Sequence, residues 1–198
     1  MGSYRTPRWG FNVHAGKMLS SSLLIRANLL FGKLEGDDSK YNTPAFRQER
    51  NFKFSAAVRE LTGQLVWFPL KRNKWSPYVF GGLGVSSLSI NRDWSGINYA
   101  YFGGEASALA TALAMDSAQK LPGTTPVGLA GIGVKYFLTE SIAVNGEYAY
   151  RVMRTDYLDG FSLSANPDQK DHYMSYSLGI TYHSGRKKRP LDCPVLRY

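Results

Sequence analysis

Residues 142–152, with the sequence IAVNGEYAYRV, alternate between apolar and polar side chains. Val144 and Tyr148 fall on one face of this stretch, and Asn145 and Glu147 fall on the other. A period of two residues indicates a β-strand, whereas an amphipathic helix would repeat every 3.6 residues. The stretch therefore predicts a strand whose two faces meet different surroundings.

The same alternation recurs along the chain of 198 residues and gives seven expected strands. These strands cover residues 9–18, 23–35, 52–68, 77–90, 126–137, 142–152 and 173–183. The connections are alternately short and long, at residues 19–21, 36–51, 69–76, 91–125, 138–140 and 156–171. All the long loops therefore emerge at one end of the sheet. This asymmetry is typical of transmembrane β-barrels of the bacterial outer membrane.

The polar face distinguishes a membrane barrel from a soluble β-protein. A soluble sandwich or barrel turns its apolar face inward and carries many charged residues outside. Here the polar face is poor in lysine and mixes small residues with Arg26, Glu60, Glu147 and Arg151. Such a mixture suits a crowded interior. We therefore expect an all-β, antiparallel, up-and-down transmembrane barrel with its apolar face in lipid.

Aromatic side chains gather near the expected strand ends, where amphipathic rings favour the lipid headgroups. The girdle at the short-turn end would contain Trp67, Phe68, Trp75, Tyr136, Phe137 and Tyr182. The girdle at the long-loop end would contain Trp9, Phe52, Phe54, Tyr150 and Tyr173. The two girdles predict the two boundaries of the membrane.

Seven strands are one short of a closed barrel, because bacterial single-chain barrels have an even strand count. The strand at 9–18 runs toward a short turn, so a strand of opposite direction is expected before Tyr4 in an eight-stranded barrel. Closure by another chain or by irregular structure is the alternative. By the same count the chain leaves its last strand at the short-turn end, which is periplasmic in an outer membrane. We expect a barrel over residues 4–185 and a basic periplasmic tail over residues 186–198.

Several short motifs carry a family resemblance over most of the chain. The most specific are Asp156-Tyr157-Leu158-Asp159 and Cys193-Pro194. The others are RNFKFS at 50–55 with Glu60-Leu61, SPYVFGGLG at 76–84, PVG at 126–128, GIGVKY at 131–136, Glu147, Tyr150-Arg151 and Thr155. On these motifs the chain resembles the PorG-like outer-membrane barrels of the type IX secretion and gliding machinery. The long 91–125 loop and the missing first strand depart from that pattern.

The resemblance implies a non-enzymatic, structural component of a protein-export machine in the bacterial outer membrane. The implied partners are the periplasmic ring proteins of that machine, including a lipoprotein subunit, and outer-membrane lipid. Two other classes stay open. An outer-membrane enzyme acting on lipid would need a polar constellation near a lipid-facing rim. A soluble lipocalin-like carrier would need an apolar interior.

The charged residues Arg26, Glu60, Glu147 and Arg151 form the first candidate site, because all four lie on the polar face. An eight-stranded barrel is just wide enough for side chains to fill it. Isolated buried charges are costly, so these groups should pair. We expect a salt-bridge plug that holds the barrel shut, with proton or ion passage as the alternative.

The long loops contain two further features. Asp156, Tyr157, Leu158 and Asp159 lie at the base of one loop, where we expect the carboxylates to cap a turn and pair with Arg154. A partner-binding role at the outer face is the alternative for this motif. In the 91–125 loop, the alanine-rich segment 105–115 predicts two or three helical turns.

The C-terminal tail is the expected site of function. The formal charge is +9, and residues 186–198 supply +4 of it, from five Lys and Arg residues and one Asp. A basic segment of this kind binds by ordering on an acidic protein partner, with anionic lipid headgroups as the alternative. The expected partner-binding residues are Arg186, Lys187, Lys188, Arg189, Leu191, Cys193, Val195, Leu196 and Tyr198. Cys193, the single cysteine, is available for a bridge to another subunit.

Other kinds of site find no support in the sequence. The three histidines show no metal-ligand spacing, and a single cysteine cannot form a cysteine metal cage. The glycine run 81–84 lies inside a strand and opens no helix, so it does not fit a nucleotide-binding loop. The tail has no interleaved aromatics, which argues against nucleic acid. We expect no catalysis, cofactor, metal, nucleic acid or small-molecule substrate.

Overall fold

A computed structural model describes residues 8–40, 42–70, 74–155, 161 and 172–184. Its seven strands are β1 (Gly10–Met18), β2 (Leu23–Asp37), β3 (Lys53–Trp67), β4 (Trp75–Asp93), β5 (Thr124–Phe137), β6 (Ile142–Met153) and β7 (His172–Tyr182). Three short helices lie in the long connections: η1 (Asp38–Lys40), α1 (Phe46–Arg50) and α2 (Ala108–Ala118). No helix in these residues has the length and apolar character needed to cross a membrane.

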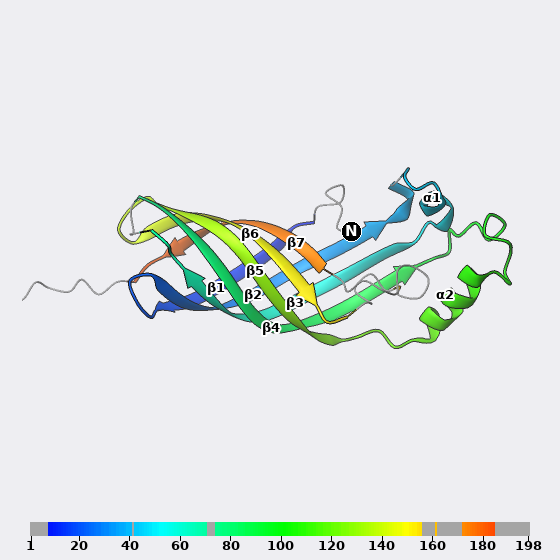
Figure 1. Ribbon diagram of the computed structural model, residues 1–198, viewed down its shortest axis with the longest axis horizontal. Helices are drawn as coiled ribbons and strands as arrows, with labels where there is room; N and C mark the ends of the chain where they lie inside the picture. Colours follow the sequence, from blue (N-terminus) through cyan, green and yellow to red (C-terminus); the bar gives the residue numbers. More distant parts are fainter. Residues whose placement is uncertain (1–7, 41, 71–73, 156–160, 162–171, 185–198) are drawn as a thin grey trace, which may run out of the picture.

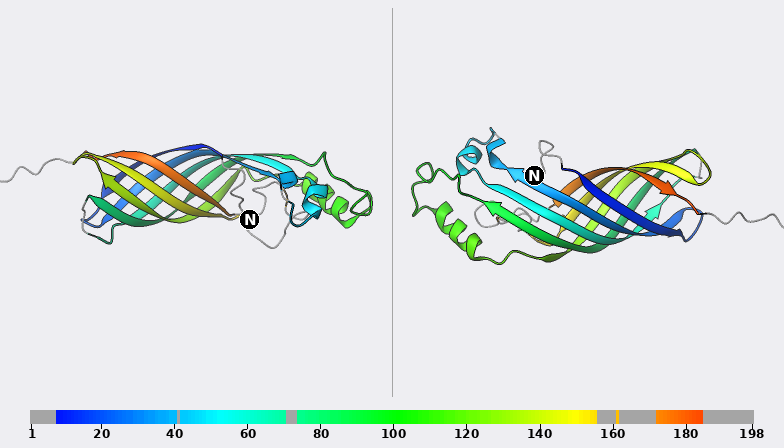
Figure 2. Two further views of the ribbon diagram at one scale, coloured as in Figure 1. Left: turned by 90° about the horizontal axis from the view of Figure 1, so that it is seen from above. Right: turned by 180° about the vertical axis from the view of Figure 1, so that it is seen from behind.

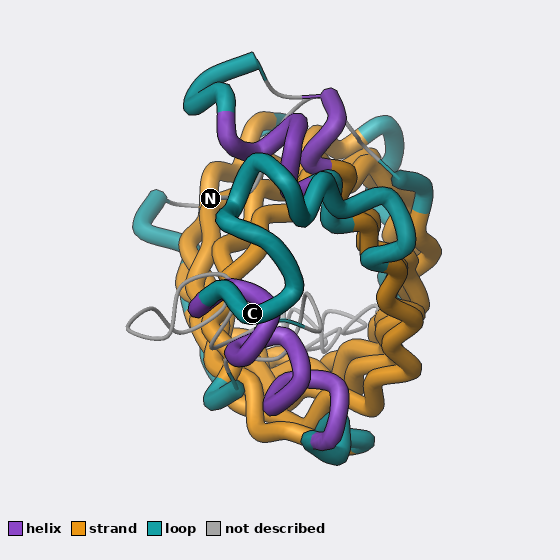
Figure 3. Tube along the Cα trace, turned by 90° about the vertical axis from the view of Figure 1, so that its right-hand side faces the viewer, coloured by secondary structure: helices purple, strands orange, loops and turns teal. Residues whose placement is uncertain are grey.

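The seven strands form one sheet in which each strand pairs antiparallel with the next along the chain. The sheet curls into an incomplete barrel (Figure 1), and the view along its length shows the strands arranged around a common axis (Figure 3). The prediction of an all-β, up-and-down antiparallel barrel is confirmed. In the described residues β1 and β7 share no ladder, and both run toward the short-turn end. The closing strand of opposite direction stays a prediction.

The direction in which the side chains point is also confirmed. On β7, the apolar residues Leu178 and Ile180 are 88% and 78% exposed on the outside of the sheet. On β3 the inward positions are buried and read Val58, Glu60, Thr62, Gln64 and Val66 in order. The barrel therefore has an oily exterior and a polar belt inside.

The expected aromatic girdles are correct only in part. Trp67, Trp75 and Tyr182 are exposed on the outer face, as a girdle at the short-turn end requires. Phe52 and Tyr173 are instead buried, so their assignment to the second girdle is wrong. Alternation explains Tyr173, which has the same parity as the inward-facing residues of β7. Phe52 precedes β3 and packs beneath the outer loops.

The interior is layered along the barrel axis. Toward the long-loop end it contains an apolar cluster of Val58, Leu88, Val127, Met153 and Tyr173. Toward the short-turn end it contains a second cluster of Val66, Tyr78, Phe80, Leu129 and Ala149. On β3 the polar residues from Glu60 to Gln64 separate the two. On β3, polar side chains thus form a middle layer between two apolar layers.

Strands β2, β3 and β4 are longer than their neighbours at the long-loop end. Their segments 33–37, 53–57 and 89–93, here called the β2–β4 lobe, pair with one another beyond the ends of β1 and β5. Figures 1 and 2 show the lobe extending past the other strands toward α1 and α2. The expected strand ends at residues 35 and 90 were too early. Hydropathy alternation ends where the sheet leaves the apolar band, but backbone pairing continues.

The outer loops form a small core of their own above the barrel. Phe52 stacks on Phe161 with ring centroids 4.2 Å apart, and Leu113 of α2 packs into the same cluster. The guanidinium of Arg92 donates 2.7 Å to the carbonyl oxygen of Asp116, at the end of α2. Within the described residues, the long 91–125 loop therefore contains a docked helix. That helix spans 108–118, slightly later than the expected 105–115, because Ser107 caps its first turn.

Candidate functional site

The structure brings the four predicted interior charges together as two ion pairs. In the first pair, Arg26 of β2 meets Glu147 of β6 across the barrel, because these strands are not neighbours in the sheet. The Nη1 atom of Arg26 lies 2.6 Å from Oε1 of Glu147, and Nη2 lies 3.1 Å from Oε2. A guanidinium that donates twice to one carboxylate combines strength with a fixed geometry. This pair therefore holds two distant walls together.

The second pair joins Glu60 of β3 to Arg151 of β6. The Nε atom of Arg151 lies 3.0 Å from Oε1 of Glu60, and neither side chain is more than 4% exposed. Tyr173 donates its hydroxyl to the other carboxylate oxygen of Glu60 at 2.7 Å, and Arg151 also donates to the hydroxyl oxygen of Ser175. Both oxygens of the Glu60 carboxylate and two nitrogens of the Arg151 guanidinium thus meet a complementary partner, as buried charges require. Strands β3, β6 and β7 are joined through one carboxylate and one guanidinium.

Polar side chains other than the four predicted charges complete the polar belt. Gln64 accepts from Nε of Arg26 at 2.6 Å, and its own amide donates to the hydroxyl of Thr62 at 2.9 Å. Tyr78 donates its hydroxyl to Oε1 of Glu147 at 2.6 Å. The sequence feature that could have identified Tyr78 is its position on β4, because it lies an even number of residues from the inward-facing Ser86 and so faces the same side. A tyrosine on a polar face is a donor for a buried carboxylate.

A third buried cation lies below the two ion pairs. Lys135 of β5 is only 6% exposed, and its ammonium lies 5.7 Å from the ring centroid of Phe68 and 6.0 Å from that of Tyr78. The guanidinium of Arg26 lies 4.7 Å from the ring centroid of Phe80. Cations near aromatic faces gain electrostatic stabilisation, the more so when they are desolvated. Aromatic rings thus continue the belt toward the short-turn end.

This arrangement can hold charge and join strands, but it offers little for chemistry on a substrate. Within the described ranges, no group of three or more His, Cys, Asp or Glu side chains is placed to hold a metal ion. The carboxylates already accept from arginines and tyrosines, so neither is presented to a ligand. The four interior charges are therefore engaged with one another and with neighbouring polar side chains.

Gly133 of β5 allows Tyr78 to reach Glu147. A Cβ atom built at Gly133 would lie 2.4 Å from Cζ and 2.6 Å from the hydroxyl of Tyr78. We expect Gly133→Ala to lower the free energy of unfolding by about 1–3 kcal/mol, the usual cost of an overpacked interior. Urea titration in lipid vesicles measures this. Gly128→Ala on the same strand is the control, because its Cβ would meet only Leu83 at an ordinary 3.6 Å. Equal stability of the two variants would contradict the prediction.

Two other sets of candidate residues lie outside the described residues. They are the loop-base motif, Asp156, Tyr157, Leu158 and Asp159, and the tail from Arg186 to Tyr198. The roles expected for both sets stay predictions.

An oily exterior around a paired, polar interior is the reverse of a lipocalin-like carrier, so that alternative is wrong. The family model of the outer membrane protein beta-barrel domain matches residues 2–183. The chain belongs to this family. A search of curated proteins finds no significant match. As a member of the outer membrane protein beta-barrel domain family, the protein is a transmembrane barrel of the bacterial outer membrane, and its exposed leucines, valines and isoleucines face hydrocarbon.

Proposed function

We propose that this outer-membrane barrel is a structural component of a type IX protein secretion machine of the PorG-like kind. Its short turns and basic tail would hold periplasmic ring proteins, including a lipoprotein subunit, at the membrane. In this proposal the long loops face the exterior of the cell and the C-terminus lies in the periplasm. The barrel itself catalyses nothing and serves as the anchor.

The observation that carries the proposal is the filled interior. The pairs Arg26–Glu147 and Glu60–Arg151 cross the barrel, and apolar clusters lie above and below them. A barrel that is packed in this way resists deformation, which is what an anchor under load needs. The surfaces left for function are then the two ends and the lipid-facing wall.

The short-turn end supports the proposal by its construction. Connections 19–22, 68–74 and 138–141 all lie there, and β7 ends at Tyr182 on the same side. The basic residues 186–189 follow within a few positions of that end. The positive charge of the tail sequence suits an acidic partner on this side.

Removal of the tail tests the proposal. We expect a variant ending at Gly185 to insert into the outer membrane normally but to lose at least nine-tenths of its recovery of the ring proteins in an affinity pull-down. A variant with Arg186, Lys187, Lys188 and Arg189 changed to Gln separates the effect of charge from that of tail length. If the ring proteins bind the tail through acidic groups, this variant should lose most of their recovery. Crosslinking through Cys193, with Cys193→Ser as the control, should label a ring protein. Undiminished recovery by the variant ending at Gly185 would refute the proposal.

A further inference from the structure

Arg59 is a charged residue on the outer wall of the barrel. It is exposed on β3, and its cross-strand neighbours on that face are Phe31 of β2 and Ser87 of β4. Within the residues that the structure describes, its guanidinium has no hydrogen bond, ion pair or ring contact. A guanidinium in contact with hydrocarbon is unfavourable, so a side chain of this kind marks a boundary or meets an anion.

The residues below Arg59 show which boundary this is. The next outward row contains Leu29, Leu61 and Val85, which are 44%, 51% and 52% exposed. The rows above it belong to the β2–β4 lobe and contain Lys33, Ala57 and Ser89, then Glu35, Ser55 and Asn91. The wall thus changes from oily to polar at the height of Arg59. That height is where the acyl chains of a lipid end and its headgroup begins.

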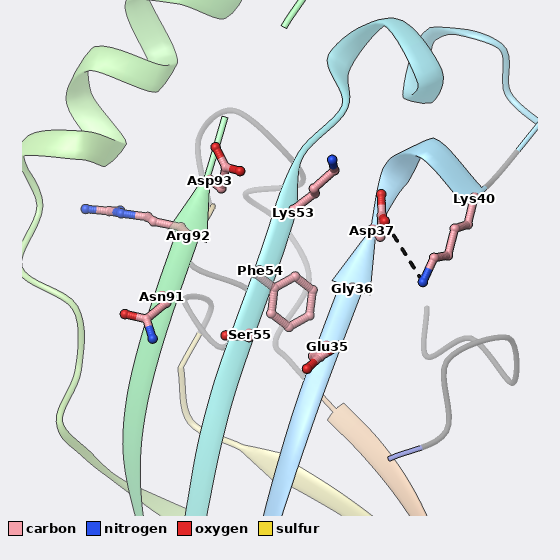
Figure 4. Close-up of a pocket in the computed structure, with 10 residues that line it drawn as sticks. All are labelled: Glu35, Gly36, Asp37, Lys40, Lys53, Phe54, Ser55, Asn91, Arg92 and Asp93. Carbon is pink, nitrogen blue, oxygen red and sulfur yellow. Dashed lines mark ion pairs between the residues drawn. The ribbon is translucent and has the colours of Figure 1, made fainter. Parts of the chain in front are cut away.

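The polar groups above Arg59 are arranged around a hollow of about 260 Å³. Its lining includes six outward-facing residues of the lobe: Glu35, Asp37, Lys53, Ser55, Asn91 and Asp93 (Figure 4). Lys33 and Arg8 pair with Glu35, and Lys40, which also lines the hollow, lies 4.0 Å from Asp37. Hydrogen bonds from Ser95 hold the pKa of Asp93 below its usual range. Carboxylates, an amide and the ammonium groups of Lys40 and Lys53 in a hollow of this size offer both acceptors and donors to the hydroxyl groups of a sugar.

We propose that the outer wall of the β2–β4 lobe binds a phosphorylated glycolipid of the outer leaflet. The acyl chains lie on the apolar wall around Leu61, one phosphate pairs with Arg59, and the sugar occupies the hollow above. This inference uses the proposed orientation, with the long loops outside, but not the proposed periplasmic partners.

Binding of purified protein in nanodiscs or detergent tests the inference by native mass spectrometry. The probes are a phosphorylated glucosamine-disaccharide lipid, the same lipid without phosphate, phosphatidylglycerol and inorganic phosphate. We expect the phosphorylated glycolipid to bind most tightly. Arg59→Gln should weaken it about tenfold, the size expected for the loss of a charge-assisted hydrogen bond. Arg59→Lys should restore part of the affinity, because it keeps the charge but loses the planar donor geometry.

Lys17→Gln is the matched control, because Lys17 is also exposed but lies on β1 near the short-turn end. It should leave binding unchanged, and Arg59→Gln should keep the native electrophoretic mobility of a folded barrel. The inference is overturned if Arg59→Gln binds the phosphorylated glycolipid as tightly as wild type does, or if Arg59→Gln and Lys17→Gln lose affinity equally. It is likewise overturned if removal of the lipid phosphate has no effect on affinity, or if phosphatidylglycerol binds as tightly as the glycolipid. It is also overturned if millimolar inorganic phosphate displaces the lipid. Recovery of ring proteins by Arg59→Gln should equal that of wild type, so failure here is distinguishable from failure of the proposed function.

Discussion

Glu60→Ala should lower the free energy of unfolding by about 3–5 kcal/mol, the usual result of removing one partner from a buried ion pair. The substitution leaves the guanidinium of Arg151 in an interior position with no carboxylate, and it also removes the acceptor for the hydroxyl of Tyr173. The side chain of Glu60 is fully buried, so water does not replace the lost contacts. We expect the largest effect of any single interior substitution here.

Urea titration of the barrel in lipid vesicles, followed by tryptophan fluorescence, measures this loss. The control is the double variant Glu60→Leu with Arg151→Met, which replaces both charges by apolar groups of similar size. Because an intact buried pair is close to neutral relative to apolar packing, the double variant should be more stable than Glu60→Ala. If the double variant is the less stable of the two, the penalty does not come from the orphaned charge.

Leu83→Arg should cost about 2–4 kcal/mol of unfolding free energy, as expected for a cation on the lipid face near the bilayer midplane. Leu83 is 76% exposed, and its cross-strand neighbours Gly63 and Gly128 have no side chains to cover it. In water such a change on an exposed strand position would cost little. The predicted loss therefore depends on hydrocarbon around the sheet.

Ser89→Arg provides a matched control for this prediction. Ser89 lies on the same strand and the same outward face as Leu83, but above the apolar band. Its replacement by Arg should cost at most about 1 kcal/mol, because the effect falls off near the membrane boundary. Both proteins are compared in the same vesicles. Equal effects at the two positions would show that the apolar face does not lie in the membrane.

Alternation along single strands was sufficient to predict the architecture and the direction of the side chains. On β6 the parity of Glu147 and Arg151 placed both inside, and the structure agrees. That prediction needs only local sequence, since each residue of a strand faces opposite to the next. The same logic assigns Tyr78 and Tyr173 to the interior. Treating Tyr173 as a girdle residue gave weight to residue type over parity, and parity was the better guide.

The choice of partners was not accessible from the sequence. Arg26 and Glu147 are 121 residues apart and lie on strands that are not neighbours, so only the curvature of the sheet brings them together. Strand ends in the lobe were missed for a different reason. Asn91, Arg92 and Asp93 have no apolar alternation, yet their backbones pair with β3. The expected start of this strand at residue 77 was too late, because β4 already begins at Trp75.

The unequal strand lengths make the protein directional within the plane of the membrane. One side of the barrel carries the tall wall of the β2–β4 lobe, and the side of β6, β7 and β1 ends lower. Within the described residues, a neighbour that approaches along the bilayer surface meets the extended lobe on one side and shorter strands on the other. Any ring of proteins built around this barrel would therefore have its rotational orientation fixed by the position of the lobe.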